Sequence, residues 1–144
     1  MIEQDTIRLL RECDAGVQMG ISSIDDVLPY VQHPAFKEAL NANRKQHERL
    51  DKEIRSALDR FHDAGKEPGL MARGMSFMKT KAEMTLEPSD QTIADLMVDG
   101  CNMGVKSLSK YLNEYKAADE SSKDIAKRLI ALEESLSKGA RTYL

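Results

Sequence analysis

Three side chains that could bind a metal or take part in chemistry lie near the middle of predicted helices: His47, Cys101 and Glu133. Imidazole, thiolate and carboxylate groups are all ligands that a zinc ion accepts, so the three could form a mononuclear metal site. A buried imidazole also needs a hydrogen-bond partner, which a carboxylate supplies. The reading we favour is therefore a structural pair of His47 and Glu133 in the core, with Asn43 joining it. A third alternative is that Glu133, or its neighbour Glu134, faces water.

A catalytic role for these side chains has little support in the sequence. A thiol nucleophile needs a base within reach, and His47 is a conceivable base for Cys101. No recognisable catalytic motif surrounds either residue, and we expect no enzymatic activity and no cofactor. His33 and His62 lie at predicted helix ends, where a capping or solvated role is usual.

Three further residues are expected to be structural. Asp14 lies on the inner face of the first predicted helix, about five residues from the level of His47, and we expect it to face solvent or to act like a cap. Cys13 is expected at the surface or boundary of the same helix. Cys101, if it is not a ligand, is expected to be a small core residue.

Composition excludes several classes of function. The 144 residues suit one domain, 1–144. The net charge is -3, with basic residues spread among acidic ones, so there is no positive field for nucleic acid. No apolar run is long enough for a membrane span, and the N-terminus, MIEQDTIRLLRE, does not resemble a signal peptide. The two cysteines lack CxxC spacing, which favours a reducing, cytoplasmic location.

Apolar residues recur at helical spacing in four long segments, which makes the predicted fold all-α. The segments are 5–31, 34–65, 92–116 and 121–143. Short breaks join the first to the second and the third to the fourth, so each pair should form an antiparallel hairpin. Residues 65–89 carry glycine, proline and apolar side chains, and we predict a long crossover with a short helix there.

The helix ends carry their own signals. Pro34 suits the first turn of the second helix, because an N–H group at this position has no partner within the helix and proline has no N–H. Ser89 or Asp90 is expected to cap the third helix, and Ser121 or Ser122 the fourth.

The predicted crossover is rich in methionine, with Met71, Met75, Met78 and Met84 close to Phe77. Methionine fills irregular core gaps and also suits adaptable partner surfaces. The segment 70–86 therefore packs on its own bundle or forms the interface of a homodimer or of a complex with a protein partner.

The chain also contains an internal repeat. Shifted by 84 residues, the segment Gly16–Gly20 falls on Gly100–Gly104, and with a shift of 86 residues His47 falls on Glu133. Glycine inside a helix costs about 1 kcal/mol relative to alanine. The paired glycines predict a close crossing of the first and third long helices. The alternative is that they are unrelated and merely tolerated.

Two antiparallel hairpins, a long crossover and a pairing of the first and third long helices resemble the ferritin-like superfamily. The stretch MSFMKTKAEMTLEPSDQTIADLMVDGCNMGVKSLSKYLNEY is also similar to an uncharacterised bacterial branch of that superfamily. The resemblance implies a ferritin-like four-helix bundle made of two repeated helical hairpins. A di-iron member holds its metals with one Glu on each of two helices and a Glu-x-x-His on each of the others.

The ligands implied by this resemblance are mostly missing. His47 is in place, but Arg44 stands three residues before it. Glu133 stands where the second histidine is expected, and Val17 and Cys101 fill the carboxylate positions of the other two helices. Ferroxidase, oxygenase and iron-storage activities are therefore not expected.

Two classes of function remain. The first is a non-enzymatic bundle that acts by self-association or by binding a protein partner. The alternative is a protein that binds a metal or a small ligand at a degenerate central site.

Overall fold

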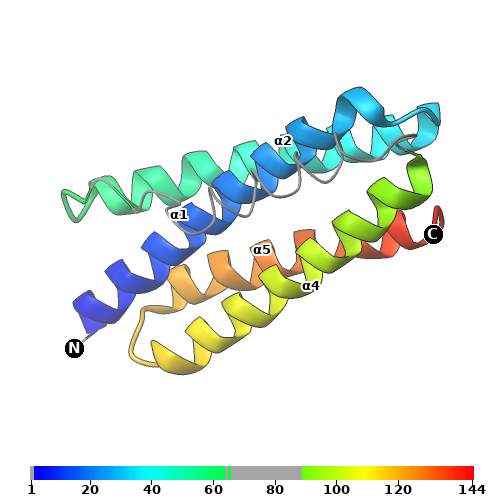
Figure 1. Cartoon of the computed structure of the whole chain (residues 1–144). Helices are drawn as coiled ribbons and strands as arrows, with labels where there is room; N and C mark the ends of the chain where they lie inside the picture. The colour runs from blue at the N-terminus through cyan, green and yellow to red at the C-terminus, as the bar shows by residue number, and fades with distance from the viewer. Residues whose placement is uncertain (1, 64, 66–88) are drawn as a thin grey trace.

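The computed structural model describes residues 2–63, 65 and 89–144, and in this part of the chain every long element is a helix. The helices are α1 (Ile2–Val27), α2 (Pro34–Asp59), α4 (Asp90–Glu114) and α5 (Glu120–Arg141). Figure 1 shows α1 with α2 and α4 with α5 as two hairpins that pack together into a four-helix bundle. The prediction of an all-α bundle is confirmed.

The helices begin where local chemistry satisfies their first N–H groups. The helix α2 begins at Pro34, and the ring of His33 caps it by accepting a hydrogen bond from the N–H of Ala35. Ser89 caps α4 by accepting from the N–H of Thr92, at 3.1 Å. These starts agree with the predicted ones.

Other ends differ from the predictions. The first helix ends at Val27, because Pro29 turns the chain into a short 3-10 segment, η1 (Leu28–Tyr30). The second helix ends at Asp59, before Gly65. The cap of the fourth helix is Asp119, which comes before the predicted Ser121 and Ser122 and accepts from the N–H of Ser122 at 2.8 Å.

Side-chain to backbone contacts fix the directions of the helices. The carboxylate of Asp90 accepts from the N–H groups of Gln32 and His33, which places the start of α4 at the turn between α1 and α2. Asp63, just after α2, pairs with Arg11 in α1 at the other end of the bundle. The described residues on either side of 66–88 thus lie at opposite ends of the molecule, and α1 and α4 run antiparallel (Figure 1).

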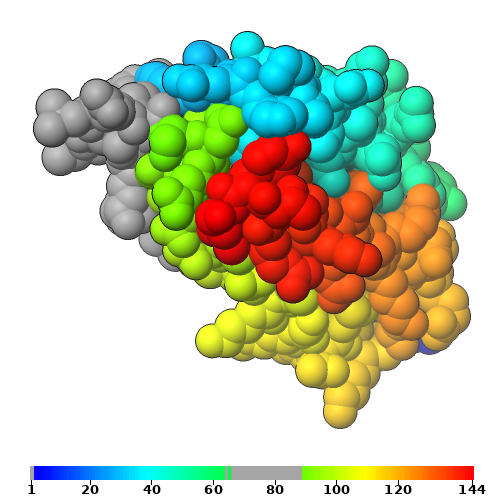
Figure 2. Space-filling model, turned by 90° about the vertical axis from the view of Figure 1, so that its right-hand side faces the viewer, coloured from blue at the N-terminus to red at the C-terminus, as the bar shows by residue number. Residues whose placement is uncertain are grey.

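Both ends of the bundle are closed by contacts between hairpins. Thr6 in α1 accepts from the N–H of Asp119 at 2.8 Å, which ties the N-terminal turn of α1 to the start of α5. At the opposite end Tyr143 stacks on Phe36, with ring centroids 4.3 Å apart. Figure 2 shows this end, where the C-terminus, the start of α2 and the start of α4 gather.

The core is divided into two apolar clusters. One holds Val17, Leu50, Leu108 and Leu129, and the other holds Ile24, Leu40, Cys101 and Leu136, each with further aliphatic neighbours. On every helix about two to three turns separate the residues of one cluster from those of the other. The level between the clusters is the middle of the bundle, and its side chains form the candidate site.

Candidate functional site

A buried hydrogen bond between His47 and Glu133 lies at the centre of this middle level. Nε2 of His47 is 3.2 Å from Oε1 of Glu133, and the histidine has no exposed surface. On its other side, Nδ1 of His47 is 3.0 Å from the backbone carbonyl of Asn43. The structure therefore brings together the α2 and α5 residues that the 86-residue shift aligns.

The protonation of the pair follows from these partners. A carbonyl oxygen only accepts, so Nδ1 of His47 must hold a hydrogen and donate it to Asn43. The contact between Nε2 and Glu133 then needs one more proton, carried either by the imidazole or by the carboxyl group. In both arrangements the pair as a whole is neutral, which suits its burial.

Cys101 of α4 joins the pair through the carboxylate. Its thiol hydrogen-bonds to Glu133, and burial together with the nearby carboxylate raises the pKa of Cys101 above its usual range. A thiol that keeps its proton is a poor nucleophile and a poor metal ligand. Because Glu133 lies between the thiol and His47, the arrangement stabilises a structural network and does not activate Cys101.

Asn43 strengthens the same network from α2. Its side-chain amide N–H donates to the backbone carbonyl of Leu132 in α5, at 3.2 Å, while the backbone carbonyl of Asn43 accepts from His47. The expectation that Asn43 joins the pair therefore agrees with the contacts.

The glycines of α1 and α4 make room for this network. A Cβ atom at Gly20 would lie 2.6 Å from Nε2 of His47, and one at Gly104 would lie 3.5 Å from Oε2 of Glu133. At Gly16 the nearest atom would be a methyl carbon of Leu129 in α5, at 3.4 Å. These neighbours are side chains from α2 and α5, so the predicted close backbone crossing of the first and third long helices is wrong at these positions.

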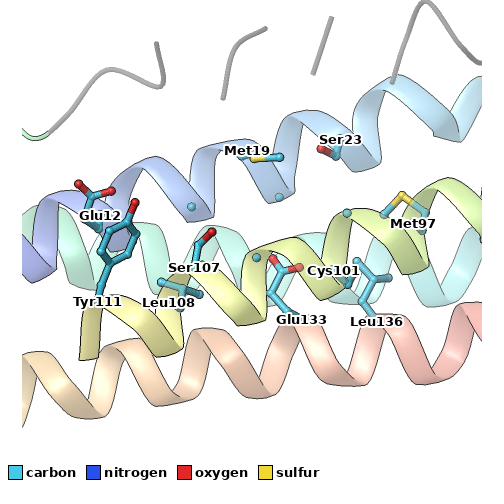
Figure 3. Close-up of a pocket in the computed structure, with 14 residues that line it drawn as sticks. Glu12, Met19, Ser23, Met97, Cys101, Ser107, Leu108, Tyr111, Glu133 and Leu136 are labelled. Atoms are coloured by element: carbon cyan, nitrogen blue, oxygen red, sulfur yellow. The ribbon is translucent and has the colours of Figure 1, made fainter. Parts of the chain in front are cut away.

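A pocket lies between the glycine pair of α1, Gly16 and Gly20, and the pair of α4, Gly100 and Gly104 (Figure 3). It is partly enclosed and runs along α1 from Glu12 to Ser23 and along α4 from Met97 to Tyr111. Its walls are mostly apolar, and the carboxylate of Glu133 rises into it from α5. The cavity volume of the pocket is about 40 Å³, several times what one water molecule needs.

The sequence did not predict this pocket, although it contained the signal. The glycine pairs marked the two walls, but glycine spacing alone cannot say whether helices meet or stand apart. Met19, Ser107 and Leu108 complete the walls.

A metal site has no support from the described geometry. Within residues 2–63, 65 and 89–144 there is no group of three or more His, Cys, Asp or Glu side chains placed to hold a metal ion. Arg44, at the position of an expected di-iron ligand, pairs with Asp25 and Glu48 near the surface. Val17, at another such position, is fully buried in an apolar cluster.

Two expectations about α1 are wrong. Cys13 is fully buried, and burial raises its pKa to about 12. Asp14 is also buried, accepts from the amide of Gln18 at 2.9 Å, and lies 3.8 Å from the guanidinium of Arg55. The reason is that α1 contacts α2, α4 and α5, so that this helix has more than one buried face.

The remaining predictions concern the surface. Glu134 is exposed, in contrast to its buried neighbour Glu133. The Met-rich segment 70–86, predicted as a dimer or partner interface, lies outside the described residues, and its role stays a prediction. None of the helices in the described part of the chain is both long enough and apolar enough to cross a membrane.

Taken together, these features define the chain as an all-α four-helix bundle with a polar layer at its centre and an adjoining apolar pocket. Comparison of the chain with protein-family models, with curated proteins and with solved structures gives no match.

Proposed function

We propose that this chain is a ferritin-like bundle without ferritin-like chemistry, and that it binds a small ligand in the pocket between α1 and α4. The observation that carries the proposal is the position of this pocket. It lies over Glu133, between α1 and α4, and Gly104 adds no side chain to it.

The directions of the helices support the ferritin-like part of the proposal. Two antiparallel hairpins pack together, and Asp63 and Asp90 lie at opposite ends of the bundle. The 84-residue repeat places glycines at matching levels of α1 and α4. These are the features that the resemblance implies, and they do not depend on a metal.

The glycines also support ligand binding over a purely structural role. At Gly20 the ring of His47 fills the space that a side chain would need, and this explains the glycine. At Gly104 a Cβ atom would make an ordinary contact at 3.5 Å, and alanine there would favour the helix by about 1 kcal/mol. The helix thus forgoes stability at a position where glycine keeps the pocket open.

Binding, and not catalysis, fits the chemistry of the site. The Cys101 thiol keeps its proton, and the pair of His47 and Glu133 is neutral and satisfied by its own hydrogen bonds. Apolar walls with few polar groups are typical of pockets that hold small molecules.

The proposal is tested by filling the pocket. Purified full-length protein is titrated with n-hexylamine, 1-hexanol and hexanoate while amide chemical shifts are followed by NMR. We expect saturable shifts at residues of α1 and α4 that line the pocket, and we expect Gly104→Leu to abolish them. Gly139→Leu is the matched control, because a Cβ at Gly139 has no neighbour within 4 Å. Binding that survives Gly104→Leu, or no binding of any probe, contradicts the proposal.

Self-association or binding of a protein partner through residues 70–86 is the other function that the sequence predicts. Light scattering with metal analysis of the purified protein separates the two. A metal-free dimer that dissociates when Met75 and Met78 are changed to serine would favour the interface, whereas a metal-free monomer would favour the pocket.

A further inference from the structure

One exposed stripe of α4 carries charges whose sign reverses near the middle of the helix. Asp95 and Asp99 lie in its first half, and Lys106 and Lys110 lie in its second half. All four side chains are exposed, and they share one side of the helix because residues four and seven apart lie above one another. The charge stripe, as we call these four residues, is about 22 Å long, with an acidic half and a basic half.

The charges of the stripe have no partner in the described part of the chain. None of the four side chains forms an ion pair or a hydrogen bond with another described residue. Asp95 and Asp99 are one turn apart, as are Lys106 and Lys110, and like charges at this spacing repel each other. The helix dipole favours acids in the first turn and bases in the last turn, so it does not account for Asp99 and Lys106.

A methionine lies where the sign of the charge changes. Met103 is 64% exposed, and the other large apolar side chains that are exposed in the described residues are Ile2 and Leu144, near the two ends of the chain. Val98 and Val105 lie on one flank of the charge stripe, where they line a groove between α4 and α5. The stripe therefore has apolar side chains at its centre and along one side.

The surroundings of the charge stripe leave it open to a partner. Lys138 and Arg141 of α5 line the neighbouring groove, and within the described residues neither of them pairs with an acid of the stripe. Gly104 and Leu108 line the pocket between α1 and α4, which lies on a different side of α4. A contact through the stripe thus leaves that pocket open.

From this pattern we infer that α4 binds a second copy of this chain, with the two α4 helices antiparallel about a two-fold axis beside Met103. In a two-fold interface every contact between unlike residues occurs twice. Asp99 then comes level with Lys106 of the second copy, and Asp95 with Lys110 of the second copy, because each pair is equally spaced about the axis. The two Met103 side chains meet at the centre.

The charge stripe is complementary to itself only in this direction. A parallel pairing would place acid against acid and base against base, so the charges fix the orientation of the two copies. The antiparallel pairing also brings Val98 of one copy close to the level of Val105 of the other, which adds apolar contact beside the ion pairs. Exposed ion pairs contribute little affinity, and one helix face in each copy is a small contact area, so the dimer belongs to the class of weak, transient complexes.

The test measures the association of the full chain by analytical ultracentrifugation, from dilute solution up to the concentrations used for NMR. We expect a reversible equilibrium between monomer and dimer that shifts toward monomer as salt is added. The single charge reversals Asp99→Lys and Lys106→Asp should each weaken the dimer about tenfold or more, because like charges then meet twice. An equal mixture of these two variants should dimerise about as well as the unchanged protein, because opposite charges face each other again in the mixed dimer.

Two further variants control the experiment. Met103→Ser should weaken the dimer without any change of charge. Lys45→Asp, a charge reversal at an exposed position of α2, should leave the dimer unchanged. At the dilute concentrations of unfolding measurements the chain is monomeric, so changes at these exposed positions should have little effect on stability, which verifies that the variants fold.

The outcomes separate this inference from its alternatives. A chain that is monomeric at every concentration overturns it, and so does a dimer that the single reversals leave unchanged. A mixture of Asp99→Lys and Lys106→Asp that associates no better than either variant alone also overturns it. A dimer that is lost in the double variant Met75→Ser, Met78→Ser but kept in the α4 variants would place the interface in residues 70–86. Failure of the proposed function would show as absent probe binding in the pocket and would leave the dimer inference standing.

Discussion

The imidazole of His47 occupies the space beside Gly20 that any other residue at position 20 would need for its Cβ atom. The distance from that Cβ to Nε2 would be 2.6 Å, and to Cδ2 it would be 2.7 Å. The ring cannot easily move aside, because it is fully buried and held by hydrogen bonds at both nitrogens. The absence of a side chain at Gly20 therefore makes room for the ring of His47.

This relationship predicts that Gly20→Ala destabilises the protein. Alanine favours a helix by about 1 kcal/mol over glycine, but the clash with a buried ring costs about 1–3 kcal/mol. We expect a net loss of about 1 kcal/mol, measured by urea denaturation. The repeat-related change Gly104→Ala should instead stabilise by up to about 1 kcal/mol, because its Cβ meets no atom closer than 3.5 Å. Equal effects at the two glycines would contradict this account.

A second prediction concerns the buried pair. His47→Leu leaves the carboxylate of Glu133 without its main partner, which for a buried ion pair costs about 3–5 kcal/mol. Glu133→Gln should cost less than about 1 kcal/mol, because the new amide can donate to Nε2 of His47. Denaturant unfolding at neutral pH checks both variants.

A His47→Leu protein as stable as the original at neutral pH would show that Glu133 can turn to solvent. If metal analysis finds stoichiometric metal that His47→Leu removes, the site is a metal site and not a structural pair.

The cysteines predict a loss of stability at alkaline pH. Burial raises the pKa of Cys13 to about 12, and burial with the Glu133 carboxylate raises the pKa of Cys101 as well. In the unfolded chain a thiol ionises near pH 8.5, so above this pH the unfolded state binds fewer protons than the folded state. Stability should then fall by up to about 1.4 kcal/mol per pH unit for each cysteine.

The measurement is the slope of unfolding free energy against pH between about 8.5 and about 10. The double variant Cys13→Ala, Cys101→Ala should show a shallower slope, whatever its stability at neutral pH. Both thiols should also resist alkylation at pH 8 until the protein is unfolded. Rapid labelling of either thiol in the folded protein would contradict their burial.

A fourth prediction concerns the contact that closes one end of the bundle. The guanidinium of Arg11, which lies on α1, lowers the pKa of Asp63 below its usual value by hydrogen bonding to the carboxylate. The contribution is present above the unfolded-state value of about 3.9 and is lost as pH falls through the lower folded value. Because Arg11 is about half exposed, the pair should contribute only about 0.5–1 kcal/mol.

Asp63→Asn should therefore lower stability at pH 7 and have little effect at about pH 2, where the original residue is protonated too. Asp99→Asn, a change at an exposed position of α4, serves as the control and should change little at either pH. A loss at Asp63 that persists unchanged in acid would show that its effect does not arise from charge.

Much of the fold could be predicted because the helices and their starts depend on local sequence patterns. Apolar spacing located the four helices, and Pro34 and Ser89 marked two of their starts. The same spacing placed His47 on an inner face, and the 86-residue shift paired it with Glu133. These signals survive folding because helix periodicity and capping depend on residues a few positions apart.

The packing around α1 was decided by the tertiary structure alone. Cys13 and Asp14 are buried because α1 contacts three other helices, whereas a sequence pattern indicates one apolar face at a time. Glycines at helical spacing permit either a close helix crossing or the entry of side chains from other helices. Gly20 faces the ring of His47, and Gly104 faces the carboxylate of Glu133, so the second arrangement holds. The sequence by itself determined which positions lack a side chain, but the rotation and separation of α1 and α4 decided what lies beside them, because those depend on contacts between distant segments.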